Sequence, residues 1–124
     1  SQCGIGVAAS AAVVSRLDRE HKQFCRRLTK VQVVGKSSAI DVFELFAGAD
    51  AAEIRMKQSS RAEFEAAGKQ FLRSQFARAR AEFAEIHQKN PNDEAARWMA
   101  DRAAVLGRHG VPEGWSGADI LSRK

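Results

Sequence analysis

The chain has 124 residues, of which 44% are hydrophobic, and its 20 Lys and Arg against 15 Asp and Glu give a formal net charge of +5. This length holds one domain or two very small ones, and the apolar share is ordinary for a globular protein. No apolar run reaches the roughly 18–20 residues that a membrane-spanning helix needs. The most apolar stretch, Ile5–Val14, also lacks a basic leader, so we expect neither membrane contact nor a signal peptide.

The positive charge raises the question of a nucleic-acid partner, because clustered Lys and Arg release counterions from a phosphate backbone. Acidic residues are interleaved with the basic ones, however, as at Arg78 and Glu82, which are spaced to pair along one helix face. No aromatic stacking platform accompanies the basic residues. We therefore expect no nucleic-acid partner.

Cysteine and histidine usage predicts no metal centre. Cys3 and Cys25 lack CxxC spacing, and the three histidines are scattered without any paired metal-ligand pattern. Free thiols in a reducing cytoplasm are the simplest interpretation of such cysteines.

Residues 24–46 predict two strands joined by a tight polar turn. Apolar and polar residues alternate over Lys30–Val33, which is the period of a strand. Gly35, which accepts a positive φ, and the serines after it mark the turn. The second run, Ile40–Leu45, is apolar on both faces, as in a strand covered on two sides. We expect the hairpin to dock onto something larger.

The order of these pieces resembles the closing segment of a class III adenylate/guanylate cyclase catalytic domain. There a valine-rich strand, a VKGK-type turn and a VYEL-type strand follow one another, and the matching residues here are Lys30–Val34, Gly35-Lys36-Ser37 and Asp41–Leu45. Ile5–Ser10 resembles the strand that precedes them, and Ala11–Asp18 resembles the helix after that strand, with Asp18 at its end. The resemblance implies that residues 1–47 are the C-terminal fragment of such a domain.

The resemblance implies a parent enzyme that converts ATP or GTP to a cyclic nucleotide and pyrophosphate with two divalent metal ions, Mg or Mn. The family's metal-binding aspartates and base-recognition residues lie upstream of the matched segment. We therefore assign this chain no catalytic residue, metal ligand or cofactor, and we expect it to be inactive alone. The family's phosphate-contacting lysine is replaced by Val34. Lys36 is the remaining phosphate-binding candidate, the alternative being a solvated turn lysine.

The composition changes at about residue 48. Residues 48–59 predict a linker or the start of a helix, and Ser60 with Glu63 forms a capping-box pattern. Asn90 is predicted to cap a helix whose first residue is Pro91. Apolar spacing predicts three helices with the inner faces Phe64, Ala67, Gly68 and Phe71; Phe76, Ala79, Phe83 and Ile86; and Ala95, Trp98, Met99, Ala103 and Leu106.

The first two of these helices resemble a tetratricopeptide (TPR) hairpin. We interpret Gly68 and Ala79 as small residues that let the two helices approach closely. Only one repeat is visible, whereas stable arrays need about three, so the unit must find packing partners elsewhere. The residues that match the family's order of large, small, aromatic and closing proline positions are Phe64, Gly68, Phe71, Phe76, Ala79, Phe83 and Pro91.

The tail fits the same family. Bacterial class III cyclases often carry an aromatic helical hairpin, a third helix, a P-x-x-W-x-G run and a terminal lysine, and the run and lysine are matched by Pro112, Trp115, Gly117 and Lys124. The predicted fold is thus α+β, with a small N-terminal β segment and a TPR-like three-helix unit over residues 60–124. We expect Trp115 to pack over the helices, the alternative being its presentation to another protein.

Two functions follow as expectations. In the first, the chain is the C-terminal fragment of a class III nucleotide cyclase, partnered by the upstream part of that domain and self-associating through its exposed sheet. In the second, it is a non-catalytic TPR-like protein-interaction or regulatory module. Both readings predict a cytoplasmic protein.

Overall fold

The computed structural model describes residues 7–33, 35, 38–115, 117 and 119–121, and it confirms the predicted α+β class. The elements in chain order are β1 (Val7–Ser10), α1 (Ala11–Val14), α2 (Arg19–Lys22), β2 (Cys25–Val33), β3 (Ile40–Leu45), α3 (Ala51–Ser59), α4 (Arg61–Leu72), α5 (Phe76–Lys89), α6 (Glu94–His109) and β4 (Asp119–Leu121).

The strands form one sheet in the order β1-β3-β2-β4. β2 and β3 make the predicted antiparallel hairpin, with Gly35 at φ +93° in its connection, and β1 pairs antiparallel with the other edge of β3. The short β4 pairs parallel with β2. A register shift between Arg27 and Thr29 marks a bulge in β2, which leaves Leu28 without a Cα partner on β3.

The helix predicted over Ala11–Asp18 is shorter than expected. α1 ends at Val14, and Asp18 begins a second helix instead of ending the first, because its carboxylate accepts the backbone N–H of His21 at 2.9 Å. An Asp side chain that captures this N–H fixes a helix start.

The second strand of the hairpin is not an apolar strand covered on both sides. Ile40 is 49% exposed, and the one buried residue of β3 is Glu44, at 0% exposure. Apolar composition alone did not reveal that a carboxylate takes the inward position.

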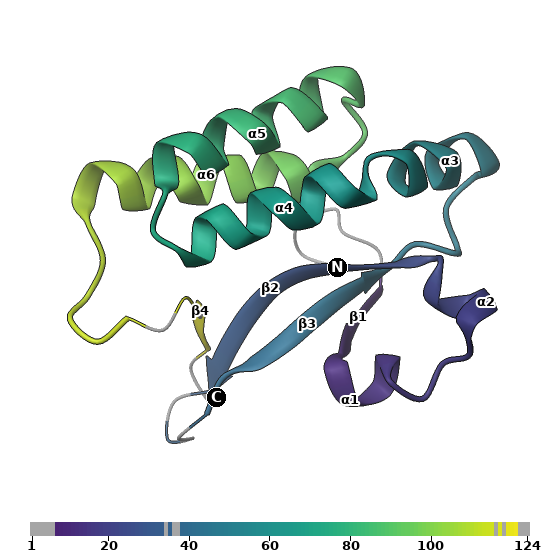
Figure 1. Ribbon diagram of the computed structural model, residues 1–124, viewed down its shortest axis with the longest axis horizontal. Helices are drawn as coiled ribbons and strands as arrows, with labels where there is room; N and C mark the ends of the chain where they lie inside the picture. The colour runs from purple at the N-terminus through teal and green to yellow at the C-terminus, as the bar shows by residue number, and fades with distance from the viewer. Residues whose placement is uncertain (1–6, 34, 36–37, 116, 118, 122–124) are drawn as a thin grey trace.

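The helices form layers on the sheet (Figure 1). α3 and α4 follow one another across it, α4 packs on β2, and α5 and α6 lie beyond α4. Residues 48–59 thus contain a helix, α3, which starts where Asp50 accepts the backbone N–H of Glu53 at 2.8 Å. The hydroxyls of Ser59 and Ser60 both donate to the carbonyl of Met56, a local bond that competes with helix continuation and separates α3 from α4.

Two predicted helix caps are wrong. Ser60 makes no capping bond to α4, because its hydroxyl is used at Met56. α6 starts three residues after Pro91, with Asp93 as the cap that accepts the N–H of Ala96 at 3.1 Å. Asn90 instead ends α5, and its amide donates to Glu53 of α3 at 2.9 Å.

One apolar cluster fills the space between the helices and reaches the sheet. Its helical members include most of those predicted from apolar spacing, with Trp98 and Leu106 partly buried against it. Ala96 and Ala100 widen the buried face of α6, and Leu28 of β2 joins the cluster from the sheet. α4, α5 and α6 therefore share one core with the hairpin strand β2.

Candidate functional site

The TPR-like aromatic residues serve this core. Phe64 and Phe83 meet edge to face with ring centroids 5.2 Å apart, and Phe71 and Phe76 do so at 5.4 Å. Such pairs add stability beyond the area they bury. Ala79, on α5 between Phe76 and Phe83, is fully buried as well. Pro91, in contrast, is exposed in the turn before α6.

Gly68 has a different neighbour from the one predicted. A Cβ built on Gly68 would lie 3.3 Å from Nη1 of Arg27 in β2, and no atom of α5 lies within 4 Å of it. The small residue therefore makes room for a guanidinium from the sheet and not for the partner helix.

Trp115 packs back over the helical hairpin. Its ring lies 5.8 Å from the ring of Phe71 and 5.6 Å from that of Phe76, measured between centroids. Nearby, Gly117 has φ +93°, and a Cβ there would lie 2.4 Å from Cδ2 of Leu72. The tail is thus fitted closely against the end of α4.

This fit predicts the effect of Gly117→Ala. An alanine at φ +93° is strained by about 1–2 kcal/mol, and its methyl would also collide with Leu72. We expect the tail to detach and the Trp115 emission to shift toward that of tryptophan in water. Fluorescence in a Trp98→Phe background isolates Trp115, and unchanged emission would show that the tail is held by other contacts.

The structure does not test the candidate phosphate-binding residue, Lys36. Lys36 and Val34 lie outside the part of the chain that the structure describes. Within that part, no group of three or more His, Cys, Asp or Glu side chains could hold a metal ion. Cys25 is a free, buried thiol whose pKa is raised by burial, which outweighs the charge of Arg61.

The most unusual feature is a buried network of four charged side chains. Arg26 of β2 donates from Nε to Glu44 of β3 at 2.8 Å, and its Nη1 and Nη2 donate to the two carboxylate oxygens of Asp93 at 2.9 and 2.6 Å. Lys57 of α3 donates to the second oxygen of Glu44 at 2.8 Å. The Arg26 guanidinium also lies 3.8 Å from the centre of the Phe64 ring.

These four charges compensate one another. Arg26, Glu44 and Asp93 are each 0% exposed and Lys57 is 6% exposed, so water contributes little to their solvation. Burial alone would raise the pKa of Asp93, but the hydrogen bond and charge of Arg26 and the N–H of Ala96 outweigh it, so the pKa is lowered. Burial likewise opposes the charge of Arg26, yet Asp93 and Glu44 raise its pKa.

A pH dependence follows from the lowered pKa of Asp93. A carboxyl whose pKa is lower in the folded than in the unfolded chain stabilises the fold above about pH 4, and this contribution is lost as the pH falls through the folded pKa. We expect Asp93→Asn to be clearly less stable than the unchanged chain at pH 7. The gap should narrow as the pH falls below about 4 and through the folded pKa, because protonated Asp93 is neutral like Asn. Urea unfolding at pH 7 and at a series of lower pH values measures it, and a gap independent of pH would contradict the charge-based account.

Sequence reasoning missed this network. In the sequence Arg26 is one of 20 Lys and Arg residues, and Asp93 lies 67 residues away from it. The only local signal was Glu44, a carboxylate on the strand face that also carries Ile40 and Val42. A charge in such a position calls for a buried partner.

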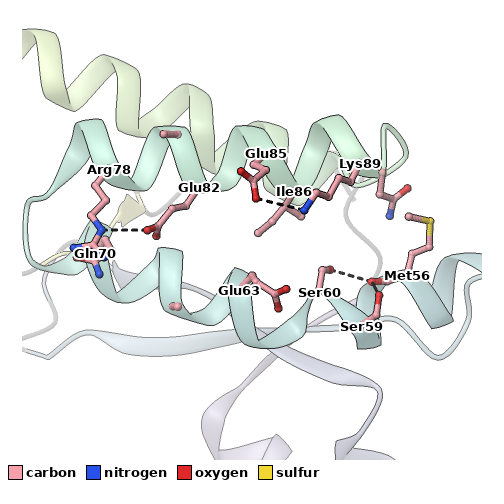
Figure 2. Close-up of a pocket in the computed structure, with 13 residues that line it drawn as sticks. Met56, Ser59, Ser60, Glu63, Gln70, Arg78, Glu82, Glu85, Ile86 and Lys89 are labelled. Atoms are coloured by element: carbon pink, nitrogen blue, oxygen red, sulfur yellow. Dashed lines mark hydrogen bonds and ion pairs between the residues drawn. The ribbon is translucent and has the colours of Figure 1, made fainter.

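A groove runs between α4 and α5 (Figure 2). Its volume is about 570 Å³, and Met56 at the end of α3 and Ile86 of α5 contribute apolar surface. The Glu63 side chain projects from α4, and Glu82 and Glu85 project from α5. This groove and the buried network are the two candidate functional features of the described chain.

Comparison with family models, with curated proteins and with solved structures found no match to this chain. Among the described residues, no helix has the length and apolar character that crossing a bilayer requires.

Proposed function

We propose that this chain is the C-terminal part of a class III nucleotide cyclase, which forms a cyclic nucleotide and pyrophosphate from ATP or GTP. The observation that carries the proposal is the order of a strand, two short helices and an antiparallel hairpin. The two paired strands of the hairpin carry the family-like residues Lys30–Val33 and Asp41–Leu45. The helical unit that follows, with Trp115 packed on it, is the kind of extension that the resemblance implies.

In this proposal the chain completes a catalytic sheet and carries no step of the reaction itself. As the family resemblance implies, Mg or Mn ions would be bound by aspartates upstream of the matched segment. The β1 edge that faces away from β3 has no partner strand among the described residues, which leaves it open to the upstream part or to a second copy. We expect concentration-dependent self-association of the isolated chain.

The buried network gives the helical extension a role in this proposal. Four buried charges join two strands to α3 and to the loop before α6, namely Arg26, Glu44, Lys57 and Asp93, so a displacement of the helices would strain the hairpin. A signal that reaches the helices would therefore be transmitted to the sheet. A buried free thiol at Cys25 agrees with the cytoplasmic location that we propose.

An activity assay of the isolated chain tests whether the catalytic residues lie upstream of it. We expect no cyclic nucleotide from ATP or GTP with Mg²⁺ or Mn²⁺, whereas the same chain joined to the upstream region of its own gene should be active. Turnover by the 124-residue chain alone would refute the proposal.

A second candidate is a non-catalytic interaction module, and the open groove between α4 and α5 favours it. Phe64 and Phe71 are 1% and 2% exposed, so they support the fold and are unsuitable as contact residues. Binding should instead depend on groove side chains. Substitutions of the groove side chains that retain the fold should weaken partner binding if this candidate is right, and should leave binding unchanged if it is wrong.

A further inference from the structure

The groove between α4 and α5 is lined partly by exposed residues. Glu63 and Ala66 of α4 and Ala81 and Glu85 of α5 line it, and all four are exposed. Ala66 and Ala81 are small and exposed, which leaves space for another backbone to approach. Met56, at 38% exposure, adds an apolar side chain at one end.

The charges in this groove are not balanced internally. Arg78 pairs with Glu82 at 3.2 Å and Lys89 pairs with Glu85 at 3.4 Å, both along α5. Glu63 on α4 has no hydrogen-bond or ion-pair partner among the described residues. The groove therefore presents an excess carboxylate on a chain whose formal net charge is +5.

A second carboxylate oxygen also lacks a partner. Oε1 of Glu82 is shielded from solvent and accepts no hydrogen bond, although Oε2 of the same group is paired with Arg78. A carboxylate oxygen without a donor is costly, and a cation beside the Glu82 carboxylate would offset part of that cost. Glu63 and Glu82 together call for a cationic donor.

The shape of the groove selects the kind of ligand. A long channel between two antiparallel helices, with small residues at its rim and apolar side chains at one end, fits the apolar face of another helix. An amphipathic helix can place a cation and an apolar side chain one turn apart on the same face. Glu63 and Met56 lie at different positions along the groove (Figure 2).

We propose that this groove binds an amphipathic helix of a partner protein, which presents an Arg or Lys to Glu63 and Glu82 and an apolar side chain to Met56. The inference deepens the second candidate function and is independent of cyclase activity. A second copy of this chain, in place of a partner protein, is one outcome of the test.

The test titrates the ¹⁵N-labelled chain with a synthetic 18-residue Ala-rich helical peptide that carries Arg and Leu one turn apart. Peaks of residues that line the groove should shift, and a matched peptide with Glu in place of Arg should bind at least about tenfold more weakly. Glu63→Gln should weaken the Arg peptide by roughly three- to tenfold. Glu20→Gln, at an exposed carboxylate on α2, is the control and should leave binding unchanged.

Several results would overturn the proposal. Equal binding of the Arg and Glu peptides would remove the charge argument, and shifts confined to other surfaces would remove the groove. Shifts of groove residues on dilution without peptide would assign the groove to a second copy. None of these measurements depends on nucleotide turnover, so failure here and failure of the cyclase proposal are distinguishable.

Discussion

Arg26→Met is expected to lower the free energy of unfolding by about 3–5 kcal/mol, because it removes one partner of a buried ion pair and leaves the others without compensation. Arg26 is fully buried and donates three hydrogen bonds to Glu44 and Asp93. Glu44 keeps Lys57 after the substitution, but the Asp93 carboxylate keeps only the N–H of Ala96. Urea denaturation at pH 7 followed by circular dichroism measures the loss.

Arg97→Met is the matched control. Arg97 also pairs with two carboxylates, Glu94 at 3.0 Å and Asp101 at 3.4 Å, but its side chain is 54% exposed. Pairs of this kind contribute at most about 1 kcal/mol. If Arg26→Met and Arg97→Met cost the same, the network does not hold the hairpin against the helices. If Arg26→Met does not fold, the milder Asp93→Asn gives the same comparison.

Phe83→Ala is expected to cost about 3–5 kcal/mol, through lost burial and the cavity that remains. Phe83 has 0% exposure and meets the edge of Phe64 at the centre of the helical cluster. The loss should appear in thermal and in urea unfolding with a single transition, since hairpin and helices share one core. This distinguishes one cooperative unit from a β segment and a helical segment that unfold separately.

Val105→Ala provides the comparison for Phe83→Ala. Val105 lies on α6 at 46% exposure, so truncation should change stability by less than about 0.5 kcal/mol. Two resolved transitions in the Phe83→Ala variant, with the sheet signal unaffected, would contradict the shared core.

The helical core could be predicted because its signal is local and periodic. Phe64, Phe71, Phe76 and Phe83 stand at helical spacing, and side chains so spaced share a face whatever surrounds them. The hairpin could be predicted for the same reason. The alternation of apolar and polar residues and the glycine-serine turn are both local patterns of a few residues.

The parts that could not be predicted depend on distant partners. A cap is decided by which polar side chain reaches a free N–H, and Ser60 and Asn90 are drawn to Met56 and Glu53 instead. Gly68 has the small size expected of a helix-contact residue, but its neighbour is Arg27, which is distant from it in the sequence. The charged network is the extreme case, because no spacing rule relates β2 to the loop before α6.

The network also shapes the account of function. A helical extension joined to a sheet by an apolar contact alone could slide, whereas the bidentate Arg26–Asp93 pair fixes orientation as well as distance. In a cyclase, such a joint would make the extension part of the catalytic body, and a ligand in the α4–α5 groove would act on that body as a whole.

The most direct test of the central proposal is cyclic nucleotide formation by the native protein purified from its own cells, assayed beside the 124-residue chain with ATP or GTP and Mg²⁺ or Mn²⁺. The account predicts product from a native protein several times larger than 13.6 kDa and none from the isolated chain. A native protein that forms no cyclic nucleotide, or an isolated chain that does, would contradict it.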